Sequence, residues 1–437
     1  MQTVDTLLHA RWIIPVTDND PVLENHTVAI QDGKIVSILP QAQASAQFHS
    51  EQILTLNEHA IIPGLVNSHT HAAMSLFKGM ADDKPLMEWL QSHIWPAEQK
   101  WVSAEFVRDG ALLAIAEMLQ SGTTCFNDMY FYPDITAEAC IETGIRANIG
   151  LIVLDFPTIW AQHADEYIDK GLELHDNVLD QALLTTAFAP HAPYTVSDDP
   201  LRRVQALAEE LDVCIHMHVH ETSEEVDNSL KASGQRPLER LHDLGLLSPR
   251  MLAVHMTQLN DDDIKLVAET QTNVVHCVES NLKLASGFCP IATLHAKDIN
   301  VCVGTDSNAS NNDLDLLAET RTAALLAKAV ANDASAMNAR EALRMATING
   351  AKALGMDAMT GSLQVGKQAD MVAINLGGIA SQPVYDPVSQ IIYTASRDQV
   401  EYVWVNGKLL LEDRVLTTID TEAILNKAQA WQKKISP

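Results

Sequence analysis

The stretch IIPGLVNSHTH, residues 61–71, decides the fold of this chain. An apolar run leads into two histidines separated by one residue, and alternate residues of a β-strand point to the same side. A strand carrying His69 and His71 therefore turns both imidazoles toward one point. The pair alone is weak evidence, because this pattern also occurs by chance on many strands.

Three other segments end an apolar run with a side chain that can bind a metal or carry a proton. They are 213–218 with Glu221 close behind, 252–255 ending in His255, and 301–306 ending in Asp306. Imidazoles and a carboxylate from the ends of different strands suit a catalytic divalent metal, which needs few protein ligands and a position for water. His216, His218 and His220 alternate onto one face, so all three compete for a ligand role.

Short apolar strands alternate with helical segments through the middle of the chain, which is typical of parallel βα units. Further candidate strands are 123–126, 146–151, 184–189 and 272–277, and helical periodicity is clearest over 104–120. Eight strands fit an α/β fold with a closed (β/α)8 TIM-type barrel, in which the chemistry gathers at the C-terminal strand ends. The histidines and carboxylates fall at such ends.

Both ends of the chain predict β-structure of another kind. Residues 28–38 alternate apolar and polar side chains around Asp32-Gly33, and 400–410 form two apolar runs around Asn406-Gly407. Both patterns indicate β-hairpins. We expect one small β-sandwich domain built from residues 1–60 and 361–437, with the barrel, residues 61–360, inserted between its two parts.

The composition fits a globular protein that acts on a small molecule. Hydrophobic residues make up 47% of the 437 residues, and neither a membrane span nor a signal peptide is evident, which predicts a cytoplasmic location. The formal charge of -28 argues against nucleic acid as a partner, because it repels a polyphosphate backbone. Six scattered cysteines without a CxxC pattern fit buried side chains in a reducing compartment.

Taken together, these motifs resemble the amidohydrolase superfamily, and within it the group of 5'-methylthioadenosine/S-adenosylhomocysteine deaminases and related triazine hydrolases. The resemblance spans nearly the whole chain. It is carried by residues 63–71, 88–90, 190–194, 218–222, 255, 280–284, 304–307, 311–312 and 366–370.

The metal ligands that the resemblance implies are His69, His71, His218 and Asp306. Neutral nitrogens and one carboxylate suit Zn²⁺, with Fe²⁺ as the alternative, and the ion would lower the pKa of bound water toward ~7. Members with two metals are understood to use a bridging lysine at the end of strand 4. Here that strand ends Phe188-Ala189-Pro190-His191, so we expect a single metal.

The resemblance also implies how the reaction is catalysed. Glu221 is expected to carry a proton to the ring nitrogen beside the attacked carbon, and Asp306 to take a proton from the attacking water. His255 is expected to hold that water or to stabilise the developing oxyanion, after which ammonia leaves.

Substrate contacts are expected on both sides of the metal. The resemblance implies that Glu88 accepts hydrogen bonds from both ribose hydroxyls and that His191 reaches the purine. The expected apolar wall consists of Met74, Leu86, Trp89 and Trp95. Arg146 matches an arginine of the substrate region in related enzymes and would bind the carboxylate of S-adenosylhomocysteine, although the start of a strand lies at the opposite face of the barrel.

The predicted function is the hydrolytic deamination of 5'-methylthioadenosine, with S-adenosylhomocysteine and adenosine as further substrates. The alternatives within enzymes are a guanine- or 8-oxoguanine-type deaminase and a triazine chlorohydrolase. A non-catalytic scaffold of the same fold is the alternative from another class. Glu221 together with Asp306 favours a deaminase, and Glu88 favours a nucleoside over a free base. A homo-oligomer is implied by the resemblance alone.

Overall fold

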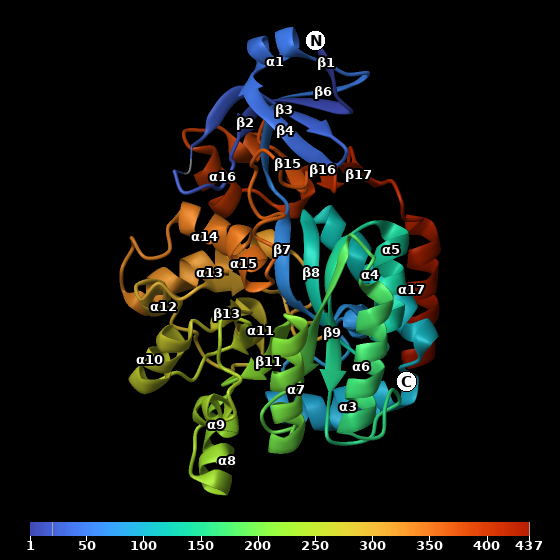
Figure 1. Cartoon of the computed structure of the whole chain (residues 1–437), viewed down its shortest axis with the longest axis vertical. Helices are drawn as coiled ribbons and strands as arrows, with labels where there is room; N and C mark the ends of the chain where they lie inside the picture. The colour runs from blue at the N-terminus through green and yellow to red at the C-terminus, as the bar shows by residue number, and fades with distance from the viewer. Residues whose placement is uncertain (20, 437) are drawn as a thin grey trace.

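The computed structural model describes residues 1–19 and 21–436 and contains a parallel barrel below a second sheet (Figure 1). Within those residues the barrel has eight strands, each paired in parallel with the next along the chain. They are β7 (Leu65–Thr70), β8 (Thr123–Met129), β9 (Arg146–Val153), β10 (Leu184–Pro190), β11 (Cys214–Val219), β12 (Met251–His255), β13 (Asn273–His276) and β14 (Val301–Val303).

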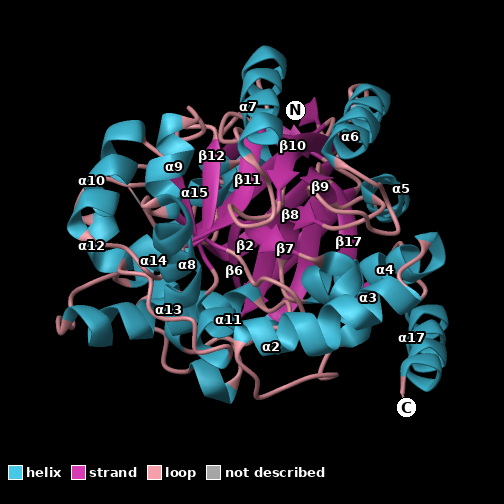
Figure 2. Cartoon of the chain, turned by 90° about the horizontal axis from the view of Figure 1, so that it is seen from below, coloured by secondary structure: helices cyan, strands magenta, loops and turns pink. Residues whose placement is uncertain are grey.

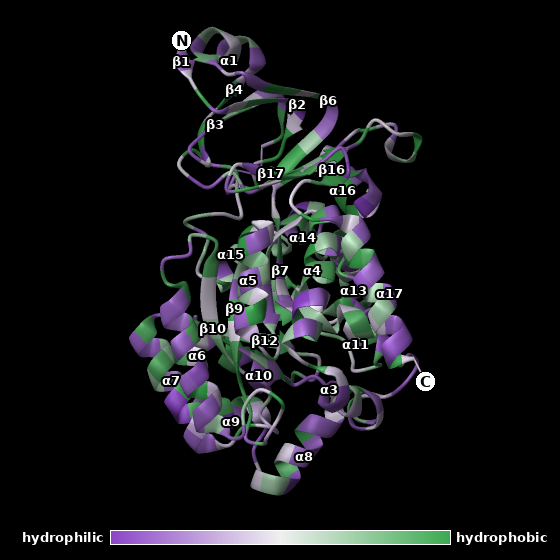
Figure 3. Ribbon diagram, turned by 90° about the vertical axis from the view of Figure 1, so that its right-hand side faces the viewer, coloured by the Kyte–Doolittle hydropathy of each residue, from purple (hydrophilic) through white to green (hydrophobic). Residues whose placement is uncertain are grey.

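Helices surround this barrel on the outside (Figure 2). They are α4 (Ala104–Gln120), α5 (Pro133–Thr143), α6 (Ala164–Val178), α7 (Asp198–Leu211), α8 (Ser223–Ser233), α9 (Pro237–Asp243), α10 (Asp261–Thr270), α11 (Val278–Lys283), α12 (Ile291–His295), α13 (Leu316–Ala331), α14 (Ala339–Met345) and α15 (Ile348–Ala353). Most carry both hydrophilic and hydrophobic residues, as Figure 3 shows, because one side faces the strands and the other faces water. The predicted helix 104–120 matches α4, whose N-cap Ser103 accepts a hydrogen bond from the Phe106 amide.

The barrel closes between its first and last strands at a single point. Thr70 and Asp306 form an isolated parallel bridge, and the Asp306 amide donates to the His69 carbonyl at 3.0 Å. Gly304 permits this approach, since a Cβ there would lie 2.7 Å from the His69 amide nitrogen. The same closure brings the carboxylate of Asp306 beside the two histidines of β7.

Both chain ends contribute strands to the second sheet. Its order is β18 (Val415–Leu416), β17 (Lys408–Glu412), β16 (Val400–Val405), β15 (Met371–Asn375), β6 (Gln52–Pro63), β2 (Thr6–Ile13), β3 (Leu23–Gln31) and β4 (Lys34–Pro40). Strands from both ends share one apolar core that includes Leu8, Ile30, Met371 and Trp404. The two predicted hairpins occur, with positive φ at Asp32, Gly33, Asn406 and Gly407.

Smaller elements complete the fold. Near the second sheet lie β1 (Gln2–Thr3), β5 (Phe48–His49), α1 (Gln41–Gln47), η3 (Ile379–Ser381), α16 (Pro387–Tyr393) and η4 (Arg397–Gln399). A helical segment after β7 contains η1 (Ala72–Phe77), α2 (Leu86–Trp89), the π-helical turn η2 (Leu90–Ile94) and α3 (Trp95–Trp101). The C-terminal helix α17 (Thr421–Ile435) packs on α4, where the Trp431 indole N–H donates to Asp109 at 2.9 Å.

The predicted fold class is confirmed, and one boundary inside the opening motif differs in detail. Ile61–Pro63 belongs to β6 of the second sheet, whereas β7 of the barrel starts at Leu65. Gly64 lies between the two strands, where a side chain would collide with Thr124.

None of the helices in the described residues combines the length and the apolarity that a membrane span requires.

Candidate functional site

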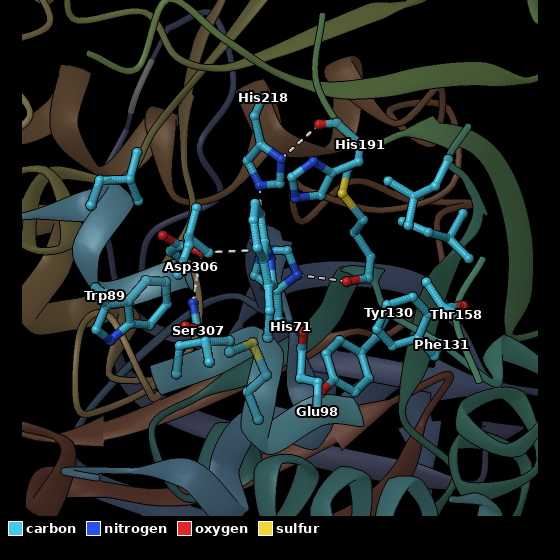
Figure 4. Close-up of a pocket in the computed structure, with 18 of the residues that line it drawn as sticks. His71, Trp89, Glu98, Tyr130, Phe131, Thr158, His191, His218, Asp306 and Ser307 are labelled. Carbon is cyan, nitrogen blue, oxygen red and sulfur yellow. Dashed lines mark hydrogen bonds and ion pairs between the residues drawn. The ribbon is translucent and has the colours of Figure 1, made fainter. Parts of the chain in front are cut away.

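The four expected metal ligands meet at the C-terminal end of the barrel. His71, His218 and Asp306 are labelled in Figure 4. His69 and His71 come from β7, His218 from β11, and Asp306 from the loop after β14. Asp306 Oδ1 lies 3.2 Å from His69 Nε2 and 3.3 Å from His71 Nε2. His218 Nε2 lies 3.2 Å and 3.3 Å from the same two nitrogens. The structure therefore brings these four residues, predicted from separate segments, to one point.

Their spacing fits one shared metal ion. Ligand atoms at 2.0–2.1 Å from a central Zn²⁺ stand roughly 3.3–3.4 Å apart along the edges of a tetrahedron. Four of the six distances between the ligand atoms are 3.2–3.3 Å, and all four atoms lie within 4.8 Å of one another. Imidazole nitrogens that face each other at this distance repel unless a cation or a proton lies between them. The donor set of three imidazoles and one carboxylate also suits a first-row divalent ion.

Hydrogen bonds on the far side of each ring orient the histidines. His71 Nδ1 donates to the Met129 carbonyl at 2.6 Å, and His218 Nδ1 donates to the His191 carbonyl at 2.7 Å. Because a carbonyl only accepts, these bonds keep the proton on Nδ1 and leave the lone pair of Nε2 facing the cluster. His69 Nδ1 lies 2.8 Å from Nε2 of His216, so His216, a rival for the ligand role in the sequence, instead contacts the back of a ligand.

Burial sets the charges of the cluster. It lowers the pKa of His69 to about 4 and, together with the neighbouring histidines, lowers the pKa of His218 well below its usual range. Burial acts to raise the pKa of Asp306, but hydrogen bonds to His69 and His71 outweigh it and hold that pKa well below the ordinary value. For His71, burial acts to lower the pKa, but the bond to Asp306, the charges of Asp306 and Asp128 and the bond to the Met129 carbonyl together outweigh it and raise the pKa, so a metal would compete with a proton at its Nε2.

The second oxygen of Asp306 is held by hydroxyl groups. Ser280 Oγ and Ser310 Oγ donate to Asp306 Oδ2 at 2.6 Å and 3.0 Å, and the Ser307 amide donates to Oδ1 at 2.8 Å. These bonds fix the carboxylate plane, so that Oδ1 stays directed at the histidines.

Glu221 and His255 lie beside the cluster. His255 Nε2 stands 3.8 Å from Glu221 Oε2, and His255 Nδ1 is 2.8 Å from the amide oxygen of Asn281. The Glu221 backbone N–H donates to Glu225 at 2.8 Å, which anchors the turn after β11. Burial raises the pKa of Glu221, against a lowering effect from His255. A carboxyl group in this position can hold and deliver a proton.

These groups form the floor of a cavity of about 540 Å³. His191 lines it, and its ring is held by Thr195 at 3.2 Å. The expected wall residues Met74, Leu86, Trp89 and Trp95 all line the cavity as well. Polar groups at the base and apolar or aromatic walls are typical of a small-molecule site.

Glu88 is not part of this cavity, contrary to the prediction. Its side chain is 54% exposed and pairs with Lys84 at 3.4 Å, one helical turn earlier. Leu86, Trp89 and Leu90 turn inward from the same segment, so Glu88 falls on the opposite side of the helix.

Arg146 is likewise absent from the cavity lining of the described residues. It stands at the first position of β9, six residues before the lining residue Ile152, which is roughly 20 Å along a strand. Its guanidinium is 2% exposed and pairs with Asp370 of the second sheet at 2.7 Å. Arg146 therefore joins the barrel to the second sheet at the N-terminal end of the strands.

Glu98 of α3 is a cavity residue that the sequence did not suggest. It lines the cavity near Tyr130, as Figure 4 shows, and burial raises its pKa to about 7, against smaller effects of the Tyr130 hydroxyl and His71. The only signal in the sequence is a glutamate within the aromatic stretch Trp95–Trp101. No known spacing from His69 and His71 would have marked this glutamate as a site residue.

Comparison with known proteins agrees with this geometry. The model of the amidohydrolase family matches residues 60–410. A protein of Saccharophagus degradans named 5-methylthioadenosine/S-adenosylhomocysteine deaminase is 52% identical over 99% of this chain and 97% of its own length. The crystal structure of an adenosine deaminase from Xanthomonas campestris with bound zinc is 50% identical, with a TM-score of 0.98 over 99% of both chains.

A more distant structure shares the fold. An atrazine chlorohydrolase from Arthrobacter aurescens, in complex with zinc, superposes with a TM-score of 0.90 over 98% of this chain and 99% of its own, at 24% identity. With the family match over most of its length, the full-length relatives and the barrel geometry in agreement, the chain belongs to the amidohydrolase family.

Proposed function

We propose that this chain is a metal-dependent aminohydrolase that converts 5'-methylthioadenosine to the corresponding hypoxanthine nucleoside and ammonia. The observation that carries the proposal is one cavity that joins the cluster of His69, His71, His218 and Asp306 to Glu221 and His255. The names of the full-length relatives support the substrate class. The same names and the zinc-bound structure make adenosine and S-adenosylhomocysteine the other candidate substrates.

The four clustered residues would hold one Zn²⁺ per chain, and the bound zinc structure of the 50% identical relative supports that metal. When bound, the ion supplies an activated water at neutral pH. A single ion is proposed because β10 ends Phe188-Ala189-Pro190 and offers no bridging lysine.

The protein groups then divide the proton transfers. Asp306 takes a proton from the attacking water. Glu221, whose pKa is raised by burial, delivers a proton to the ring nitrogen next to C6 and makes that carbon electrophilic. The oxygen of water adds to C6 while His255 stabilises the developing charge. The bond from C6 to the amino nitrogen then breaks. The proton held by Asp306 passes to the amino nitrogen, which leaves as ammonia, and the C6 hydroxyl returns its proton to Glu221 as the carbonyl forms, while the proton on the ring nitrogen stays in the product.

Glu98 takes the role that was expected of Glu88. An ionised carboxylate has two oxygens, each of which can accept a hydrogen bond from one hydroxyl of a vicinal diol. Among the described residues that line the cavity, Glu98 is the half-buried carboxylate outside the proposed metal cluster and Glu221. We assign it to the ribose hydroxyls, with His191 near the purine and Trp89 against an apolar face. This carboxylate favours a nucleoside over a free purine base or a triazine.

The test is a panel of substrates followed by ultraviolet absorbance and by ammonia release. The purified protein, loaded with Zn²⁺, should deaminate 5'-methylthioadenosine, while free guanine and a chlorotriazine should give no product. Asp306→Asn, which keeps the shape of the side chain but removes its charge, should abolish turnover. Release of ammonia from none of the adenine nucleosides would reject the proposal. Cytoplasmic location and homo-oligomerisation stay predictions from the sequence.

A further inference from the structure

Among the residues that the structure describes, neither lysine nor arginine lines the cavity. The titratable lining groups are histidines, the carboxylates of Glu98, Glu221 and Asp306, and two tyrosines. The whole chain carries a formal charge of -28, so its surroundings add no compensating positive field. Apart from the metal proposed at its floor, the cavity therefore presents no fixed cation to a negatively charged part of a substrate.

The wall formed after β9 is apolar up to the rim. Ile152 and Leu154 line the cavity and are 4% and 3% exposed, and the loop that follows adds Phe156 and Ile159. Phe156 and Ile159 are 41% and 52% exposed, so a substrate group that extends outward passes hydrophobic side chains before it reaches water. Thr158, the polar residue between them, already bonds to the Tyr167 hydroxyl at 2.5 Å.

Cations from the segments that contribute lining residues are engaged elsewhere. Lys100 follows the lining residue Gln99, but its ammonium group lies over the Trp101 ring, 4.5 Å from the centroid. Lys283 precedes the lining residue Leu284, but its ammonium group contacts Asp82 at 2.6 Å and Asn312 at 2.7 Å. Lys84 pairs with Glu88 on the outer side of the helical segment. Arg146 is held by Asp370 at the opposite end of β9.

These observations separate two substrates that share the adenine and the ribose. The 5' substituent of 5'-methylthioadenosine is a small uncharged thioether, which suits an apolar wall. That of S-adenosylhomocysteine ends in an ammonium and a carboxylate. Glu98 can attract the ammonium only by giving up hydroxyl bonds, and the carboxylate would lose water without gaining a partner, which is strongly unfavourable.

We infer that the site selects adenine nucleosides with an uncharged, apolar 5' substituent and discriminates against the zwitterionic homocysteine group. This inference rests on the proposed function. It assigns the discrimination to charge rather than to length, with the wall of Ile152, Leu154, Phe156 and Ile159 as the determinant.

The test compares three nucleosides on the zinc-loaded protein: 5'-methylthioadenosine, S-adenosylhomocysteine, and 5'-butylthio-5'-deoxyadenosine. The butylthio compound resembles the homocysteine group in length but has no charge. Its kcat/KM should lie within about tenfold of that of 5'-methylthioadenosine, whereas S-adenosylhomocysteine should fall by at least about 100-fold, as expected for an unpaired charge. Comparable kcat/KM values for S-adenosylhomocysteine and 5'-methylthioadenosine would overturn this inference but leave the proposed function intact. An equal loss for both long substrates would also overturn it, because length would then be the cause.

A substitution at the rim adds an independent measurement. Ile159→Arg places a cation at a half-exposed position, and Ile159→Gln is the matched variant of similar size without charge. The ratio of kcat/KM for S-adenosylhomocysteine to that for 5'-methylthioadenosine should rise at least about tenfold in Ile159→Arg relative to Ile159→Gln. An unchanged ratio in a folded variant that still deaminates 5'-methylthioadenosine would count against charge as the cause. Failure of every adenine nucleoside to react would instead reject the proposed function, and the inference with it.

Discussion

The two glutamates of the helical segment offer the sharpest test of how the substrate is held. Glu98 lines the cavity, whereas Glu88, ten residues earlier, is 54% exposed and pairs with Lys84. Glu98→Gln keeps the size of the side chain but removes its charge and one of its two acceptor oxygens. Glu88→Gln makes the same chemical change on the outer side of the same segment and is therefore the matched control.

The size of the effect follows from the bonds that are lost. A hydrogen bond to a charged group contributes about 1.5–3 kcal/mol, so Glu98→Gln should lower kcat/KM for 5'-methylthioadenosine by about 10- to 150-fold. Glu88→Gln should stay within about twofold of the unmodified protein, because exposed ion pairs contribute about 0–1 kcal/mol to stability and this pair lies away from the cavity.

Substrates that lack one ribose hydroxyl test whether the loss of activity in Glu98→Gln arises from contacts to the ribose. The unmodified protein and both variants would be assayed with 5'-methylthioadenosine and with its 2'-deoxy and 3'-deoxy forms. Removal of a hydroxyl should cost the unmodified protein about tenfold in kcat/KM but cost Glu98→Gln markedly less, since one bond is already absent. If Glu98→Gln matched the unmodified protein, or if the deoxy forms lost equal activity in both, the assignment of Glu98 would be wrong.

Three further predictions concern the pH response, the metal and the closure of the barrel. Burial raises the pKa of Glu98 from 4.5 to about 7, so the ionised acceptor form predominates above that value. The kcat/KM for 5'-methylthioadenosine should therefore rise as the pH increases through about 7, and Glu98→Gln should lose this rise. Chelation should abolish turnover, one equivalent of Zn²⁺ per chain should restore it, and elemental analysis showing two tightly bound ions per active chain would contradict the single-metal site. Gly304→Ala should destabilise the fold by about 1–3 kcal/mol in denaturant titrations and weaken metal retention, because the new Cβ would lie 2.7 Å from the His69 amide nitrogen. Gly378→Ala, where no heavy atom lies within 4 Å of the added Cβ, should change neither property, and equal effects of the two variants would refute the packing argument.

The sequence predicted the barrel and the metal cluster because both depend on local patterns. Alternation places His69 and His71 on one side of a strand, and parallel strands end at the same face, so residues far apart in sequence meet there. For this reason His218 and Asp306 lie close to His69 and His71. Alternation alone did not decide between His216 and His218, because that choice depends on how far β11 extends toward the cavity. The resemblance favoured His218, because its spacing to Glu221 matches that of the family.

The sequence did not predict that Glu98 lines the cavity, because the helical segment changes its period. Leu86, Leu90, Ile94 and Glu98 all line the cavity, at intervals of four residues. Twelve residues make about three and a third turns of regular α-helix, which would turn Glu98 a third of a turn away from Leu86. The π-helical turn η2, over Leu90–Ile94, widens the helix and absorbs that rotation. A regular period therefore does not predict that Glu98 faces inward, and a local insertion of this kind leaves no clear mark in the sequence.

The closure of the barrel and the proposed metal site depend on the same few atoms. Between β7 and β14 the backbone pairing consists of the Thr70 to Asp306 bridge, and β14 is only three residues long. The Asn67 side chain supplements it, since its oxygen accepts from the Thr305 amide at 3.0 Å and its nitrogen donates to the Thr305 hydroxyl at 2.7 Å. An ion held by His69, His71 and Asp306 would cross this seam and tie the first strand to the last. Because three of the four ligands would then be shared between catalysis and closure, substitutions that open the seam should release the metal before they unfold the remaining strands. The position of the site at the seam thus follows from the topology: it is where a bound ion contributes most to holding the barrel closed.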